Sequence, residues 1–76
     1  MPYQFLFDLP DSVQHVLPKH AQEIYLAAFN HAYDEYKDPQ DRREEQSLEE
    51  VSHKVAWSAV KHHYHKDDNG RWVKNP

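Results

Sequence analysis

The chain has 76 residues, 38% of them hydrophobic and 29% charged, with a formal net charge of −4 at pH 7, which suits one small folded domain over residues 1–76. It contains no cysteine and a single glycine, which excludes disulfides, thiolate zinc sites and glycine-rich phosphate loops. No apolar run is long enough to span a membrane, and the first residues lack the basic and apolar regions of a signal peptide, so a cytoplasmic protein is expected.

Two Leu-Pro pairs predict where the first two helices begin. Proline is well accommodated in the first turn of a helix, where its missing N–H would have no partner. We therefore expect a short helix from Pro10 to about Val16 and a second helix from Pro18 to about Lys37. An apolar stripe recurs along the second helix at helical spacing, with Phe29 at its edge. The stripe comprises Ala21, Ile24, Tyr25, Ala28, Ala32 and Tyr36.

A third helix is predicted from Ser47 to about Tyr64. Ser47 and Glu50 have the spacing of a capping box, which marks a helix N-terminus. The helix is apolar over most of its circumference, which is typical of the central helix of a domain. Its main stripe is Leu48, Val51, Ser52, Val55 and Ala59, and its polar line is Lys54, Ser58, Lys61 and His65. We assign Ala28, Val51, Val55 and Trp57 to the core.

The C-terminal part predicts a hairpin. Asn69-Gly70 favours positive φ, and residues 64–66 and 71–73 on either side can pair as strands. The aromatic start at residues 3–5 could add a strand or cover the core, and residues 38–46 form a polar connection. We expect a mainly α single domain of about three helices with a short two-stranded β-sheet or hairpin near the C-terminus.

The charge is distributed unevenly along the chain. Residues 34–50 carry eight acidic side chains against three basic ones, whereas residues 51–76 carry two acidic against five basic ones. These stretches are interpreted either as hydrated surfaces of a soluble domain or as an acidic segment and a basic tail that meet different partners.

Five sequence blocks, in order and with compatible spacing, resemble the ChaB family. They are DLPDSV at residues 8–13, HVLP at 15–18, HAQEIY at 20–25, AFN at 28–30 and HKVAWSAVK at 53–61. Asp41-Arg42-Arg43 and Trp72 also resemble the family pattern, whereas Phe5-Leu6-Phe7 departs from its more polar start. The resemblance implies a domain of about three helices with a short two-stranded sheet. It also implies a bacterial intracellular regulator of cation transport, named for its association with a calcium/sodium–proton antiporter.

Catalytic and metal-binding motifs are not evident in the sequence. No serine lies in a nucleophile motif and no cysteine is present, so we expect neither an enzyme nor a bound cofactor. His62, His63, His65 and Asp67 could bind a metal weakly, but no dedicated metal site is predicted. The stretch that begins at His65 resembles a calcium loop at a few positions but has His65 and Pro76 where the two most informative acidic ligands belong.

The favoured function is a non-catalytic binding module that acts, as a monomer, through a protein partner such as a cation/proton antiporter or another regulator. Leu26 and Tyr33 lie beside the core stripe and could form an exposed patch with Phe5 or Phe7, unless the N-terminal segment folds over them. The other candidate contacts lie in the acidic segment. They are Asp41, Arg42, Arg43, Glu44 and Glu45.

A small nucleic-acid-binding module is the alternative function. Cationic side chains interleaved with an aromatic residue can bind phosphates and stack on bases. The candidates are Lys54, Lys61, His65, Arg71 and Trp72. The isoelectric point of about 5.9 argues against this alternative, because dedicated binders are usually basic.

Overall fold

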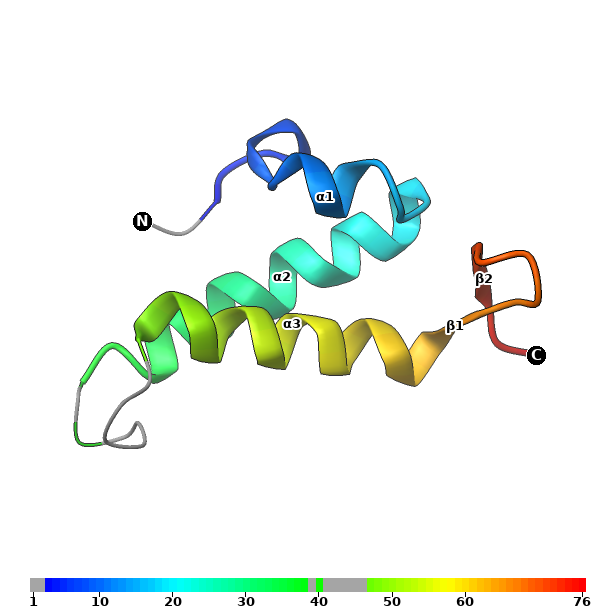
Figure 1. Ribbon diagram of the computed structural model, residues 1–76. Helices are drawn as coiled ribbons and strands as arrows, with labels where there is room; N and C mark the ends of the chain where they lie inside the picture. Colours follow the sequence, from blue (N-terminus) through cyan, green and yellow to red (C-terminus); the bar gives the residue numbers. More distant parts are fainter. Residues whose placement is uncertain (1–2, 39, 41–46) are drawn as a thin grey trace.

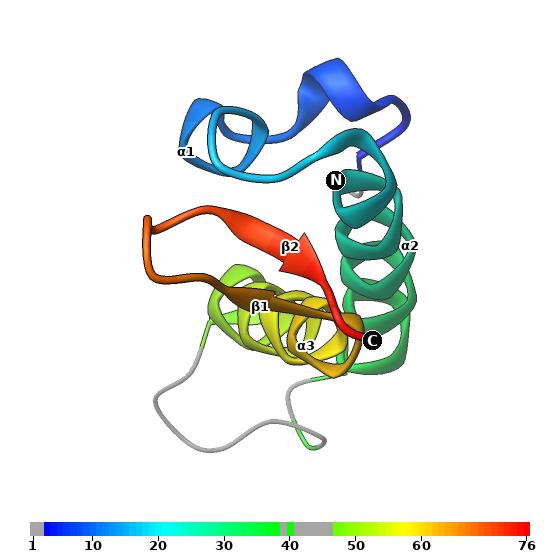
Figure 2. The same cartoon turned by 90° about the vertical axis from the view of Figure 1, so that its right-hand side faces the viewer.

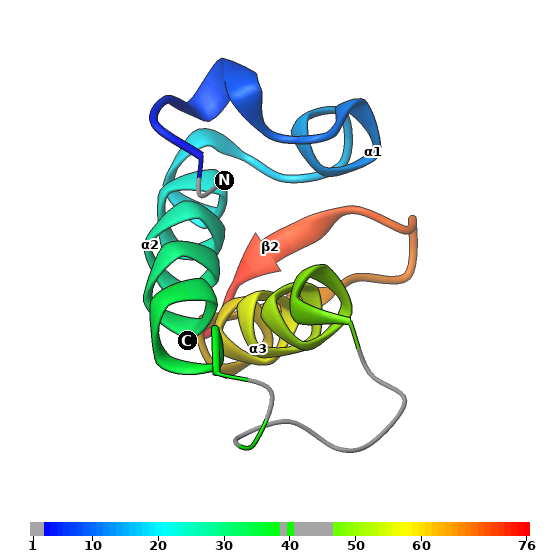
Figure 3. The same cartoon turned by 90° about the vertical axis from the view of Figure 1, so that its left-hand side faces the viewer.

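The computed structural model describes residues 3–38, 40 and 47–76. In chain order, its elements are the 3-10 helix η1 (Leu6–Asp8), the helices α1 (Asp11–Gln14), α2 (Lys19–Glu35) and α3 (Leu48–His63), and the strands β1 (Tyr64–Lys66) and β2 (Trp72–Lys74). Helices α2 and α3 run side by side in opposite directions and make the most extensive contact (Figure 1). The segment with η1 and α1 lies across one side of this pair, and the hairpin follows the end of α3 (Figure 2, Figure 3). The predicted fold class is confirmed.

The two prolines begin helices as the sequence predicts. Pro10 is the N-cap of α1 and Pro18 is the N-cap of α2, and each helix ends two residues earlier than predicted. Leu9, Val13 and Leu17 recur every four residues through this segment, and all three are buried in the core. The burial of this apolar row therefore holds α1 against the two long helices.

Two glutamines fix the end of α1 relative to α2. The last carbonyls of a helix have no partner within it and need other donors. Gln22 Nε2 donates to the carbonyl of Leu17 at 2.9 Å and to that of Gln14 at 3.3 Å. Gln14 Nε2 donates in turn to the carbonyls of Leu9 and Phe7. These bonds set the position of the chain around α1, which matters for the site described below.

The centre of the core lies between aromatic side chains of α2 and small side chains of α3. Tyr25 and Phe29 are buried on α2, and Ser52, Ala56 and Val60 are buried on α3. The hydroxyl of Ser52 donates to the carbonyl of Leu48 at 2.8 Å, so its burial leaves no unpaired donor. Bulk on one helix is thus matched by small residues on the other.

The predicted core assignment is partly wrong. Val51 is buried, but Ala28, Val55 and Trp57 are only partly buried, whereas Phe29, predicted at the edge of its stripe, is 1% exposed. The buried stripe of α3 is rotated from the predicted one, because close packing against the rings of α2 requires small side chains rather than the largest apolar ones. Trp57 consequently lies on the flank of α3.

A local signal defines the start of α3. Ser47 Oγ accepts a hydrogen bond from the backbone N–H of Glu50 at 3.0 Å, which confirms the predicted N-cap. The helix ends at His63, and Tyr64 begins β1. Within the part of the chain that the structure describes, no helix combines the length and the apolar character needed to cross a membrane.

The hairpin is built around the side chain of Asp67. Strands β1 and β2 are antiparallel, with Lys66 opposite Trp72. Asp67 Oδ1 accepts hydrogen bonds from the backbone N–H groups of Asn69 at 2.9 Å and Arg71 at 2.8 Å. Gly70 adopts a φ of 80°, as predicted for this turn. The second strand begins at Trp72, one residue later than predicted, because Arg71 belongs to the turn.

The aromatic start covers the core and does not join the hairpin. Asn30 on α2 accepts a hydrogen bond from the N–H of Tyr3 at 2.9 Å and donates to its carbonyl at 2.6 Å. The ring of Tyr3 lies 4.7 Å from that of Phe29. Of the two predicted roles for this segment, covering the core is the one observed, because Asn30 occupies both backbone groups that a strand partner would need.

Candidate functional site

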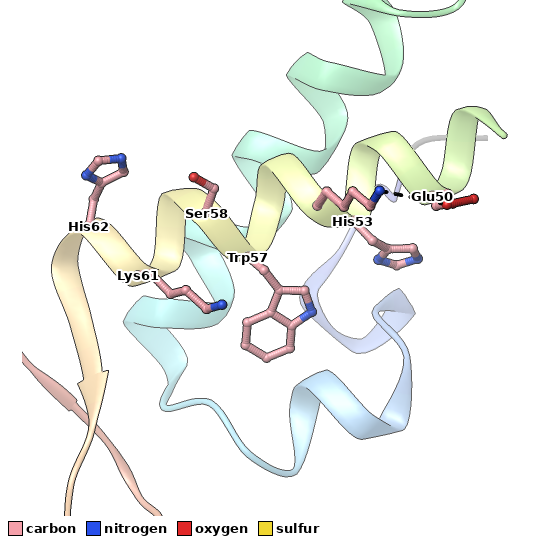
Figure 4. A pocket seen from close by; sticks show the side chains of 7 residues that line it. Glu50, His53, Trp57, Ser58, Lys61 and His62 are labelled. Atoms are coloured by element: carbon pink, nitrogen blue, oxygen red, sulfur yellow. Dashed lines mark ion pairs between the residues drawn. The ribbon is translucent and has the colours of Figure 1, made fainter. Parts of the chain in front are cut away.

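A groove runs along the flank of α3 and continues into the space between the chain around α1 and the hairpin. It consists of two adjoining depressions that share Trp57 and Lys61, and we call it the Trp57–Trp72 groove. The first depression lies along α3 from Glu50 to His62 and has a volume of about 770 Å³ (Figure 4). The second lies between residues 12–16 and the hairpin, where Trp72 lines it. All the residues that line the first depression belong to α3, so it is an open face of that helix and not an enclosed cavity.

The floor of the groove is aromatic. The rings of Trp57 and Trp72 lie 5.6 Å apart, centroid to centroid, at 36°. Behind them, Tyr25 meets Trp57 in an edge-on arrangement with centroids 5.3 Å apart. Because Tyr25 is itself buried, the position of Trp57 is fixed by the core while the side chain stays partly open to solvent.

The rim of the groove is cationic. Lys54, Lys61 and Lys66 line it, and Glu50 is the one acidic residue among its described lining residues. Lys54 Nζ lies 3.9 Å from Glu50 Oε2, in an exposed ion pair that is weak in water. Lys66 Nζ lies 5.9 Å from the centre of the Trp72 ring, within cation–π range. Among the described residues, no carboxylate pairs with Lys61.

A partly buried hydrogen bond supports the groove from the core side. Tyr25 Oη and His53 Nδ1 are hydrogen-bonded, and the His53 ring lies 4.7 Å from that of Phe29. Burial raises the pKa of Tyr25 to about 12, and the nearby Tyr3 adds to the rise. Burial lowers the pKa of His53, against a smaller opposite effect of Glu49. At neutral pH the phenol and the imidazole are therefore both uncharged.

The lowered pKa of His53 predicts a loss of stability in mild acid. An imidazole that resists protonation when folded contributes stability above its unfolded pKa of about 6.5, and that contribution is lost as the pH falls below this value. One such group changes the unfolding free energy by at most about 1.4 kcal/mol per pH unit. Urea denaturation at pH 7.5 and 5.5 should therefore show a smaller acid loss for His53→Gln than for the wild type.

The matched control is His31→Gln, because His31 is an exposed histidine on α2. This variant should keep the acid loss of the wild type. Equal pH dependence in His53→Gln and the wild type would mean that His53 is not held uncharged by burial.

The structure brings together three of the five residues predicted for nucleic-acid binding. Lys54, Lys61 and Trp72 line the groove. His65 lies on β1, where its Nδ1 is 2.6 Å from Asn75 Oδ1, and Arg71 lies in the hairpin turn. His65 does not extend the polar line of α3, because the helix has already ended.

The residues predicted for protein binding lie elsewhere. Leu26 and Tyr33 are partly buried on α2 and pack against the core. Phe5 and Phe7 are 49% and 73% exposed, and their rings stack on each other at 5.2 Å. The remaining candidates fall outside the described residues, and the contact role of the whole set stays a prediction. They are Asp41, Arg42, Arg43, Glu44 and Glu45.

The histidine-rich end of α3 does not form a metal centre in the described part of the chain. No three histidine, aspartate or glutamate side chains gather there in a geometry that could hold an ion. The Oδ1 atom of Asp67 accepts two backbone hydrogen bonds of the turn. The resemblance to a calcium loop is thus explained by turn geometry.

Sequence reasoning missed the central residue of the groove. Trp57 follows Lys54 by three residues and precedes Lys61 by four, and this spacing places all three on one helix face. Figure 4 shows Trp57 and Lys61 pointing to the same side of α3, with Ser58 and His62 pointing to the other. That spacing was the available signal, whereas Val16 joins the groove only through tertiary packing.

The comparisons with known proteins all match the same family. The ChaB family model matches residues 9–75. Proteins of Escherichia coli (strain K12) and Shigella flexneri, each named "Putative cation transport regulator ChaB", are 61% identical over 74 residues, covering 97% of this chain and 97% of their own. A solution NMR structure with the same name superposes with a TM-score of 0.81 at 59% identity, covering 99% of this chain and 100% of that one. Nothing in these names supports the nucleic-acid alternative.

Proposed function

Because the chain belongs to the ChaB family, we propose that it is a cytoplasmic, non-catalytic binding module that regulates cation transport by contacting a protein partner. The relatives carry the name "Putative cation transport regulator ChaB", and a binding module can regulate a transport system by contacting it or another of its regulators. A cation/proton antiporter or a second regulator would be such a partner. The chain would act as a monomer.

The observation that carries this proposal is the Trp57–Trp72 groove. Tryptophan residues are enriched among the side chains that dominate protein–protein binding energy. Here two of them adjoin in an open groove, and Tyr25 fixes one of them from the core side. Such a preformed aromatic floor loses little conformational entropy when a partner covers it.

The edge at Leu26 and Tyr33 remains a second candidate contact. Both side chains already pack against the core, so they offer less uncovered apolar surface than fully exposed residues would. The groove is therefore the better-supported surface for a partner.

The proposal predicts that Trp72→Ala abolishes most of the effect of this protein on cation transport. Calcium/proton and sodium/proton exchange would be measured in inside-out membrane vesicles from cells that lack the protein, with the purified variants added. The wild type should change the exchange rate, and Trp72→Ala should not, because the floor of the groove loses one of its two rings.

Val73→Ala is the control, because Val73 lies on the same strand but alternates to its other face. It should act like the wild type, and circular dichroism would establish that both variants fold. A wild-type protein without any effect on either exchange activity would refute the regulatory proposal.

A further inference from the structure

We propose that the Trp57–Trp72 groove binds a short acidic peptide segment that inserts a large apolar side chain between its lysines. This inference rests on the proposed function, because it names the chemistry of the partner segment at that same site. Three features of the groove carry it: the charge of its rim, the apolar character of its floor and its length.

The rim selects for carboxylates. Lys54, Lys61 and Lys66 surround the aromatic floor, and all three are exposed. The exposed ion pair of Lys54 can be exchanged for a carboxylate of a ligand at little cost. Lys61 has no carboxylate partner among the described residues, so a ligand carboxylate beside it replaces only water. Complementary charge of this kind favours an acidic partner.

The floor requires that the occupant also bring apolar surface. Trp57 and Trp72 are only partly buried, and Val16 at the edge of the second depression is 46% exposed. A free inorganic anion would leave these groups in water. A phenylalanine or leucine side chain packed on them would remove apolar surface of both molecules from water.

The extent of the groove suits a peptide. On the side of α3 that carries Trp57, the first depression extends from Glu50 to Lys61, and eleven helical steps correspond to roughly 16 Å. An extended chain covers this distance with about five or six residues. The groove therefore accommodates a hexapeptide in which acidic residues flank an apolar one.

A continuous polyanion fits this surface less well. Glu50 lies on the groove wall and would face a phosphate backbone that follows α3. A peptide can instead place an uncharged residue opposite Glu50 and an apolar side chain on the tryptophans.

The test is an NMR titration of the full chain, labelled with ¹⁵N, with synthetic hexapeptides at low salt and millimolar concentration. The probes are the peptide Asp-Glu-Phe-Glu-Asp-Leu, its amide analogue Asn-Gln-Phe-Gln-Asn-Leu and its alanine analogue Asp-Glu-Ala-Glu-Asp-Ala. We expect the first to shift the indole N–H signals of Trp57 and Trp72 together with the amides of the three lysines. Both analogues should bind about tenfold more weakly.

The matched variants are Lys61→Glu and Lys19→Glu, which make the same change inside the groove and at the exposed start of α2. Lys61→Glu should weaken binding of the acidic peptide about tenfold, and Lys19→Glu should leave it within about twofold. Equal effects of the two variants would mean non-specific attraction and would overturn the proposal.

Three other outcomes would also overturn it. They are the absence of groove shifts with the acidic peptide, shifts confined to Leu26 and Tyr33, and tighter binding of a short DNA duplex at the same residues. The vesicle measurement distinguishes this failure from failure of the proposed function. A protein that alters cation exchange but ignores the peptide keeps its regulatory role and loses only this ligand class.

Discussion

Phe29→Ala is expected to lower the free energy of unfolding by about 3–5 kcal/mol, as full truncation of a buried aromatic side chain does. Phe29 is 1% exposed, and its ring lies 4.7 Å from those of Tyr3 and His53. A domain of 76 residues has a total stability of about 4–11 kcal/mol, so the variant should be largely unfolded or close to it. Urea and thermal denaturation followed by circular dichroism would measure the loss.

The same truncation at Phe7 is the control, because Phe7 is 73% exposed. Phe7→Ala should change the stability by no more than about 0.5 kcal/mol. Trp57→Ala should fall between the two variants, because Trp57 is only partly buried. A Trp57→Ala loss larger than that of Phe29→Ala would restore the core assignment that the sequence pattern suggests.

The starts of the helices and the hairpin turn could be predicted because their signals are local. Pro10, Pro18 and Ser47 act through the backbone groups next to them, and Gly70 acts through its own φ angle. None of these signals depends on what the element packs against. Their positions in the structure accordingly agree with the sequence reasoning to within one or two residues.

The centre of the core could not be predicted in the same way. Helical spacing shows that α3 has a broad apolar side, but a broad stripe gives no sign of which part of it faces the neighbouring helix. The answer depends on α2, because Tyr25 and Phe29 belong to the same buried cluster as Ala56 and Val60 of α3. Which residues of α3 are buried therefore depends on how α3 packs against α2, and not on the sequence of α3 alone.

In the candidate site too, residues with a local sequence signal could be predicted, whereas residues placed by tertiary packing could not. Lys54 and Lys61 could be identified from the polar line of one helix, and the cationic character of the groove follows from them. The sequence pattern assigns Trp57 to the core because a large aromatic residue among apolar neighbours on a helix is usually buried. Val16 reaches the groove only because the apolar row from Leu9 to Leu17 fastens the first helix beside the others.

Ala56→Leu is expected to destabilise the domain by about 1–3 kcal/mol, because it adds side-chain volume at a closely packed position of the core. Ala56 is 0% exposed and belongs to the same buried cluster as Tyr25 and Phe29. The larger side chain would push α3 away from α2. Since Trp57 is the next residue and contacts Tyr25, its fluorescence should change with the loss of stability.

Ala27→Leu makes the same change at an exposed position of α2 and should alter stability by no more than about 0.5 kcal/mol. Full stability in Ala56→Leu would show that the interface has unfilled space and that small residues on α3 are not required. Weaker peptide binding by a folded Ala56→Leu, with unchanged binding by Ala27→Leu, would mean that helix spacing sets the groove geometry. The small residues that pack α3 against α2 would then also determine which ligands the Trp57–Trp72 groove accepts.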